Sequence, residues 1–164
     1  MKPAIKKILV PTDFSDLSLE AVHYAMSLSE LYGADLVLFH AVDDAPVLAF
    51  HTMEITTDFV VDDTAKTAER HLEEFARSHD IRSHYGLSLV VRRGNPYDEI
   101  TRYAKEESVD LIVMATHGRT GLAHVLLGSV AEKVVQHSDI PVLPIKPAKI
   151  RTGRPEHSTE EAVH

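Results

Sequence analysis

A glycine-containing loop between Asp110 and Val135 holds the residues of this sequence best suited to bind an anion. The stretch reads DLIVMATHGRTGLAHVLLGSVAEKVV, in which an apolar run leads to Gly118 and, nine residues later, to Gly128 and Ser129. Glycine allows backbone N–H groups to approach an anion closely. A serine at a helix N-terminus adds a hydroxyl where the helix dipole favours negative charge. The loop is therefore a candidate phosphate-binding site.

The same residues also allow an interpretation without any ligand. Ser129 is followed three residues later by Glu132, which fits the capping box S-x-x-E, so that Ser129 would only cap a helix. The spacing matches neither G-x-x-x-x-G-K-[ST] nor G-x-G-x-x-G, the two common phosphate-binding patterns. On spacing alone, both interpretations stay open.

The elements that must position this loop alternate along the chain between apolar runs of strand length and helical patterns. The strands are predicted at residues 8–10, 34–42, 87–94, 110–115 and 140–146, and the helices at 15–33, 62–80, 94–108 and 130–137. This alternation predicts an α/β fold, in which helices cover both faces of a parallel sheet. Right-handed crossovers then give a doubly wound, Rossmann-like sheet of five parallel strands.

Local signals set several of the boundaries. Ser15 and Gly33 are the expected N-cap and C-terminal stop of the first helix, and Asn95 and Pro96 suit the start of the third. Residues 43–61 show no clear period and are expected to form a mobile loop that becomes partly ordered with ligand. Residues 1–147 form one predicted domain, and the polar residues 148–164 a disordered tail.

Ligands of doubly wound sheets bind at the carboxyl edge, where the strand order reverses. Pro11, Thr12 and Asp13 follow the first strand, and the loop from Ala115 to Ser129 follows the fourth. Strands 1 and 4 commonly flank the reversal point. We therefore expect both segments to face one crevice.

Composition excludes several classes of protein. The net charge of −8 argues against a nucleic-acid or membrane-surface binder, both of which need clustered positive charge. The absence of cysteine excludes disulfides, thiolate nucleophiles and cysteine-based metal sites. No apolar run approaches the ~20 residues that span a bilayer, so the default expectation is a cytoplasmic protein. His117 and His124 match no standard zinc-ligand spacing, and no metal site is expected.

The chain resembles the universal stress protein family. The resemblance rests on the segments KKILVPTDFSDLSLEAVHYA, GADLVLFHAV, GNPYDEI and DLIVMATHGRTGLAHVLLGSVAEKVVQHSDIPVLPIK, which together cover nearly all of residues 5–147. It implies an adenine nucleotide α-hydrolase-like fold of five parallel strands and a homodimer. One branch of the family binds ATP through the pattern G-x2-G-x9-G-[ST], and another branch lacks the pattern and binds no nucleotide.

In this chain the pattern falls on Ala115, Gly118, Gly128 and Ser129, so that alanine replaces the first glycine. Alanine disfavours positive φ but costs little in an extended backbone. The apolar run that leads into Ala115 favours the extended state. The resemblance therefore implies binding of ATP, which a Mg²⁺ ion could accompany.

The resemblance also implies roles for individual residues. Asp13, with Pro11 and Thr12 beside it, would face the ribose or the adenine, and Ala41 and Met114 would line the base pocket. The expected residues around the phosphates are His117, Gly118, Arg119, Gly128, Ser129 and Val130, next to Ala115.

The sequence supports two hypotheses for the function, which belong to different classes of protein. The first is an ATP-binding regulatory dimer of the stress response, and the second is a nucleotide-free dimeric stress protein that acts through protein contacts alone. An adenylate-forming or phosphotransfer enzyme is the weaker third hypothesis, because no catalytic group accompanies the loop, and even slow ATP hydrolysis would lack an evident base. Dimerisation is expected through the last strand, residues 141–146, if that strand lies at a sheet edge.

Overall fold

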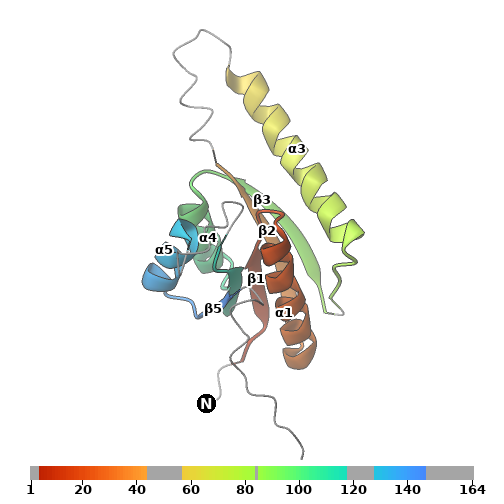
Figure 1. The fold of residues 1–164 in the computed structure, drawn as a ribbon, viewed down its shortest axis with the longest axis vertical. Helices are drawn as coiled ribbons and strands as arrows, with labels where there is room; N and C mark the ends of the chain where they lie inside the picture. Colours follow the sequence, from red (N-terminus) through yellow and green to blue (C-terminus); the bar gives the residue numbers. More distant parts are fainter. Residues whose placement is uncertain (1–3, 44–56, 84, 118–127, 147–164) are drawn as a thin grey trace, which may run out of the picture.

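The computed structural model describes residues 4–43, 57–83, 85–117 and 128–146. They form five strands and four helices (Figure 1). In chain order these are β1 (Lys7–Pro11), α1 (Asp16–Tyr32), β2 (Asp35–Val42), α3 (Thr57–Ser78), β3 (Leu87–Arg93), α4 (Pro96–Glu106), β4 (Leu111–Ala115), α5 (Ser129–His137) and β5 (Val142–Ile145). The strands and helices alternate as the sequence predicts.

The five strands form one sheet in the order β3-β2-β1-β4-β5, and every neighbouring pair is parallel. In the centre, Ile8 of β1 is in register with Leu36 of β2 on one side and with Leu111 of β4 on the other. From β1 the chain adds β2 and β3 on one side of the sheet, and it then crosses to the other side of β1 to form β4 and β5. The strand order therefore reverses between β1 and β4. The doubly wound fold and the place of its reversal point are both confirmed.

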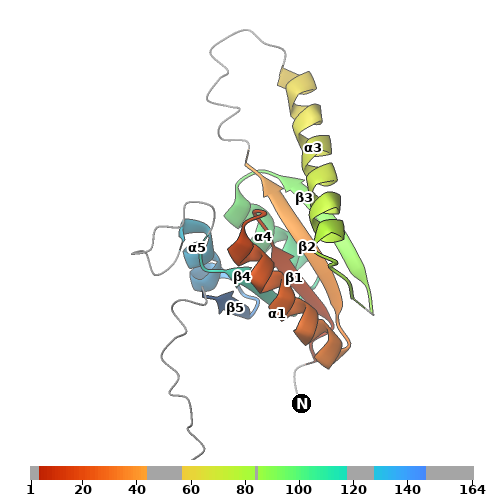
Figure 2. The same ribbon diagram turned by 45° about the vertical axis from the view of Figure 1, so that its right-hand side comes forward.

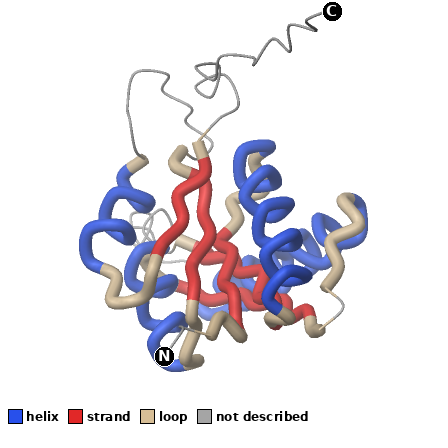
Figure 3. Tube along the Cα trace, turned by 90° about the horizontal axis from the view of Figure 1, so that it is seen from below, coloured by secondary structure: helices blue, strands red, loops and turns tan. Residues whose placement is uncertain are grey.

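Helices lie on both faces of the sheet (Figure 3). Helices α1 and α3 cover one face, and α4 and α5 cover the other (Figure 2). Side chains alternate between the faces along each strand. Ile8 and Val10 of β1 pack with α1 and α3, whereas Leu9 packs with α4, α5 and Ile112 of β4. All four side chains are fully buried, so both sides of the central strands are core, as in other parallel sheets.

The predicted helix ends are confirmed at α1 and α4. The Ser15 hydroxyl accepts a hydrogen bond from the Ser18 N–H, and Gly33 ends α1 with φ 69°, a left-handed conformation that glycine adopts without strain. The Asn95 side chain accepts from the N–H groups of Tyr97 and Asp98, with Pro96 at the first helical position. These local signals fix the turn between β1 and α1 and the turn that precedes α4.

One predicted boundary is wrong. Helix α3 begins at Thr57, so the last five residues of the segment 43–61, expected to be a loop, are helical. Val60 and Val61 are β-branched, which lowers helix propensity and hides this turn in the sequence. Residues 44–56 and the tail from residue 147 lie outside the described residues, so the expectations for them stay predictions.

Candidate functional site

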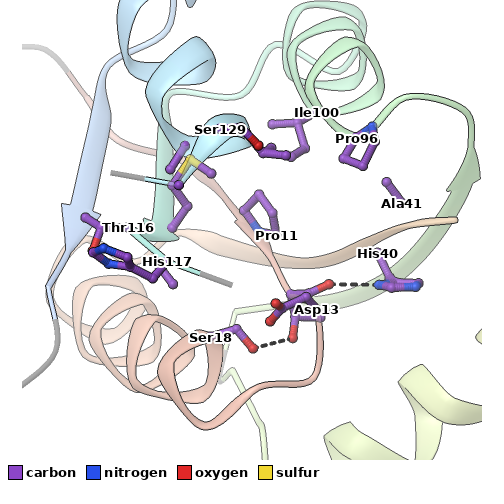
Figure 4. A pocket seen from close by; sticks show the side chains of 16 residues that line it. Pro11, Asp13, Ser18, His40, Ala41, Pro96, Ile100, Thr116, His117 and Ser129 are labelled. Carbon is purple, nitrogen blue, oxygen red and sulfur yellow. Dashed lines mark hydrogen bonds between the residues drawn. The ribbon is translucent and has the colours of Figure 1, made fainter. Parts of the chain in front are cut away.

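A cavity of about 260 Å³ opens at the carboxyl edge of the sheet, where β1 and β4 end (Figure 4). It is bounded by the turn after β1, the end of β2, the first turn of α4, the end of β4 and the start of α5. Ten of the twelve predicted site residues line it: Pro11, Thr12, Asp13, Ala41, Met114, Ala115, His117, Gly128, Ser129 and Val130. The other two, Gly118 and Arg119, lie outside the described residues, as does His124.

Six further residues line the cavity and were missed from the sequence. They are Ser18, His40, Pro96, Ile100, Thr116 and Ala131. Pro96 and Ile100 could have been found, because helix α4 starts directly after β3 and its first turn must lie at the same edge of the sheet. That signal was present in the order of elements but not in any sequence motif.

A chain of hydrogen bonds holds the turn after β1. The Phe14 N–H donates to Thr12 Oγ1 (3.0 Å), which is 2.9 Å from Ser18 Oγ, and the Ser18 hydroxyl donates to the Ser15 carbonyl (2.8 Å). Because the Ser18 proton goes to that carbonyl, Thr12 must donate to Ser18. Thr12 and Ser18 are buried. This chain fixes the backbone on both sides of Asp13.

The His40 ring lies behind this turn. Its Nδ1 is 2.8 Å from the Thr12 carbonyl oxygen, which can only accept, so Nδ1 carries a proton. Figure 4 shows this bond beside Asp13. The Phe14 ring packs on His40 with 4.4 Å between ring centroids. His40 is thus a half-buried, hydrogen-bonded histidine, and its ring also forms part of the cavity wall.

The start of α5 shows that the capping-box interpretation of Ser129 is wrong. Gly128 is the N-cap, with φ −69° and ψ 153°, no side-chain cap bond is present, and Ser129 is the first helical residue. The Gly128 N–H donates to the Thr116 carbonyl (2.5 Å), and the helical ladder starts with the Glu132 N–H on the Gly128 carbonyl (2.8 Å). A contact with the end of β4 therefore decides where α5 begins.

This start leaves backbone donors at the cavity. The N–H groups of Ser129, Val130 and Ala131 precede the first ladder bond, so no carbonyl within the helix can accept from them. All three residues line the cavity. Together with the dipole of the nine-residue helix, they make this wall suitable for an anion.

The backbone of Ala115 is extended. It is the last residue of β4, in register with Ile145 of β5. Among the described residues other than glycine, only Phe14, Asp80 and Ser108 have positive φ. An alanine therefore meets no backbone strain at this position, and the expectation of an extended conformation is confirmed.

The chemistry of the cavity differs between its sides. Pro11, Ala41 and Met114 contribute apolar atoms to the cavity wall. The Asp13 carboxylate and the Ser129 hydroxyl lie on opposite sides of Pro11 (Figure 4). The arrangement can hold a flat apolar group, offer an acceptor to hydroxyls at Asp13, and donate to an anion at Ser129.

Two properties of the described residues bear on other functions. They contain no group of three His, Cys, Asp or Glu side chains placed to hold a metal ion. In the described ranges, no helix is both long and apolar enough to cross a membrane.

Comparison with known proteins identifies relatives over most of the chain. The model of the universal stress protein family matches residues 4–146. Universal stress protein MJ0531 of Methanocaldococcus jannaschii is 34% identical over 147 residues, which cover 88% of this chain and 84% of the relative. The solved structure of MJ0577 from the same organism superimposes with a TM-score of 0.75 at 30% identity, over 88% of this chain and 97% of that chain.

A further solved structure is that of a universal stress protein in complex with cAMP. It has a TM-score of 0.58 and 26% identity, and the match covers 87% of this chain and 98% of that chain. The family match spans all five strands and the four helices described above. The chain therefore belongs to the universal stress protein family.

Proposed function

We propose that this protein binds ATP in the cavity between β1 and β4 and acts as a nucleotide-dependent regulatory protein of the stress response. The observation that carries the proposal is the meeting of three groups around one cavity. They are an apolar wall, a carboxylate after β1 and the donor-rich start of α5. These groups match the base, the ribose and the phosphates of a nucleotide.

The adenine would lie against the apolar wall. Ala41 at the end of β2 and Met114 in β4 approach the cavity from two strands, and Pro96 and Ile100 approach from α4. The cavity volume, about 260 Å³, is just below the range of roughly 300–1,000 Å³ typical of small-molecule sites. It suits the nucleoside, with the phosphates extending along the start of α5.

The phosphates would accept hydrogen bonds from the N–H groups of Ser129, Val130 and Ala131 and from the Ser129 hydroxyl. Hydrogen bonds to charged groups contribute about 1.5–3 kcal/mol each. Such donors are needed, because the net charge of −8 disfavours an anionic ligand. An accompanying Mg²⁺ would take most of its ligands from phosphate and water and would neutralise part of the phosphate charge.

The relative solved with cAMP supports an adenine nucleotide as the ligand class, since this chain shares its fold and family. The choice of ATP over other adenine nucleotides rests on the motif at Gly128 and Ser129. The regulatory role is proposed because the chain belongs to the universal stress protein family. The cytoplasmic location stays a prediction.

The second candidate function is a nucleotide-free stress protein. The observation that favours it is Ala115, whose methyl group takes the place of a glycine hydrogen at the cavity wall. The extended backbone of Ala115 weighs against this candidate, because the methyl group then acts only through the space it fills.

We further propose a homodimer through residues 141–146. Strand β5 lies at a sheet edge, where one row of backbone groups has no neighbouring strand within the described chain. Leu143 of β5 is 37% exposed and Val135 of α5 is 41% exposed, which is apolar area for a second copy to cover. Pro144 interrupts the donors of the strand, so side-chain packing would supply much of the contact.

Calorimetric titration with Mg-ATP tests the proposed function, with Gly128→Val as the informative variant. The Gly128 backbone lies in the extended region that valine favours, so the variant should fold. The valine side chain would block the approach of phosphate to the start of α5, and we expect at least a tenfold loss of affinity. Unchanged affinity in Gly128→Val would place the phosphates elsewhere, and no binding by the wild type at millimolar ATP would favour the nucleotide-free protein.

A further inference from the structure

We propose that Ser15 is a positioning residue of the nucleotide site. Its hydroxyl orients the Asp13 carboxylate toward the ribose hydroxyls, which gives the site a preference for ribonucleotides over 2′,3′-dideoxynucleotides. This role rests on the proposed function, since it concerns the same cavity.

Two donors of Ser15 meet one oxygen of Asp13. The Ser15 hydroxyl is 2.5 Å from Asp13 Oδ1, and the Ser15 N–H donates to the same oxygen at 3.1 Å. The Ser18 N–H donates to Ser15 Oγ at 3.2 Å. A hydroxyl has a single proton, and here that proton is directed to Asp13 while a lone pair caps α1. One side chain thus couples the start of the helix to the carboxylate.

The backbone around Asp13 is held independently. Phe14 has φ 66°, a left-handed conformation that is unfavourable for a bulky residue and persists only where the surroundings impose it. Its ring packs between His40 and Phe75, with centroid distances of 4.4 and 5.5 Å. On the other side of Asp13, the Thr12 N–H donates to the Phe39 carbonyl (2.8 Å). With the backbone fixed, the remaining freedom of Asp13 is rotation of its side chain, which the Ser15 hydroxyl restricts together with the Ser15 N–H.

Restricting this rotation matters for affinity. Asp13 is partly exposed at the mouth of the cavity. Without the Ser15 hydroxyl, only the Ser15 N–H of these two donors would remain on Asp13 Oδ1. More of the ordering of the carboxylate would then occur when the nucleotide binds, and that ordering opposes binding. A carboxylate already oriented can accept short, charge-assisted hydrogen bonds from hydroxyls. The benefit goes to ligands that carry ribose hydroxyls and not to ligands that lack them.

A purely structural role for Ser15 makes a different prediction. If Ser15 only caps α1, its loss loosens the helix and weakens every nucleotide alike. The ratio of affinities for ATP and 2′,3′-dideoxyATP therefore separates the two roles, because both ligands carry the same base and triphosphate.

The test is calorimetric titration of wild type, Ser15→Ala, Ser15→Gly and Ser15→Thr with the Mg²⁺ complexes of both ligands. We expect the wild type to bind ATP about tenfold more tightly than 2′,3′-dideoxyATP. Ser15→Ala and Ser15→Gly should weaken ATP about tenfold and change 2′,3′-dideoxyATP less than about twofold. Glycine keeps most of the capping preference while it removes the hydroxyl, and threonine should retain the wild-type ratio.

Asn95→Ala is the matched control. It removes the N-cap of α4, which accepts from the N–H groups of Tyr97 and Asp98, and within the described part of the chain no hydrogen bond joins Asn95 to Asp13. The affinity ratio of this variant should stay at the wild-type value. Equal weakening of both ligands in Ser15→Ala and Ser15→Gly, or no change in either, would overturn the positioning role.

The wild type alone distinguishes this inference from the proposed function. ATP binding without preference over 2′,3′-dideoxyATP would overturn the role of Ser15 and leave the proposed function standing. Absence of ATP binding would refute both.

Discussion

Replacing Gly94 by alanine should destabilise the fold through a contact with Glu99 at the start of α4. Gly94 follows β3 and has φ 137°, a conformation that side-chain-bearing residues rarely adopt. A Cβ atom there would lie 2.8 Å from Glu99 Oε1 and 3.2 Å from Glu99 Cγ. The backbone and the side chain therefore oppose the substitution separately.

The loss of unfolding free energy in Gly94→Ala can be estimated from the backbone strain and from the displacement of Glu99. The backbone conformation costs about 1–3 kcal/mol. The Glu99 carboxylate could move aside, but its residue is only 5% exposed and Arg102 holds both of its oxygens at 2.6 Å. Because the Arg102 side chain is 58% exposed, solvent screens this pair, and we take about 1 kcal/mol for its displacement. Gly94→Ala should thus lower the free energy of unfolding by about 2–4 kcal/mol.

Urea denaturation of wild type, Gly94→Ala, Glu99→Ala and the double variant would measure both terms. Removal of the Glu99 carboxylate leaves only the backbone strain, so Gly94→Ala should cost about 1 kcal/mol less in the Glu99→Ala background. An equal cost in both backgrounds would show that Glu99 does not limit the space at Gly94. A cost below about 1 kcal/mol in the wild type would refute the backbone argument as well.

Three further predictions concern the cavity wall, the sheet edge and a buried phenol. Ala115→Gly should leave the affinity for ATP equal or improve it up to about tenfold by calorimetry, and a loss would mean that the alanine methyl group contributes to binding. If the protein forms the proposed dimer, Val142→Asp and Leu143→Asp should each give monomers in light scattering, whereas a dimer that survives both substitutions would have its interface elsewhere. Burial of the Tyr103 phenol raises its pKa most, the negative charge of Glu107 raises it further, and the positive charge of Arg92 lowers it. The net pKa is raised, so the folded state favours the neutral phenol. As the pH rises above about 10, Tyr103 ionises first in the unfolded chain. The stability that Tyr103 contributes is therefore lost between its pKa in the unfolded chain and its higher pKa in the folded protein. Between pH 9 and about 11, Tyr103→Phe should therefore lose less unfolding free energy than the wild type in urea denaturation, and an equal loss would contradict this.

The sequence predicts the fold well because its signals are local and repeated. Apolar runs alternate with helical patterns, and caps such as Ser15 and Asn95 are formed by residues within a few positions of the helix they start. The crevice is predictable for a related reason, because the turns that follow parallel strands lie at the same edge of the sheet. Ten of the twelve predicted site residues therefore line one cavity.

What the sequence does not predict depends on contacts between distant segments. Ser129 fits a capping box, yet the bond from the Gly128 N–H to the Thr116 carbonyl shifts the cap to Gly128. His40 joins the cavity wall, with its Nδ1 bonded to the Thr12 carbonyl 28 positions earlier in the chain, and no motif marks it. Phe14 has a left-handed backbone that its residue type does not suggest. That conformation is imposed by the packing of its ring and the bonds of its neighbours.

The central claim is that the cavity between β1 and β4 holds ATP, and amide chemical shifts of ¹⁵N-labelled protein during titration with Mg-ATP test it most directly. We predict saturable shifts concentrated at Asp13, Ala41, Ser129 and Val130, which lie after β1, near the end of β2 and at the start of α5. Absence of shifts at millimolar ATP, or shifts confined to the residues around Ile140 after the end of α5, would contradict the claim.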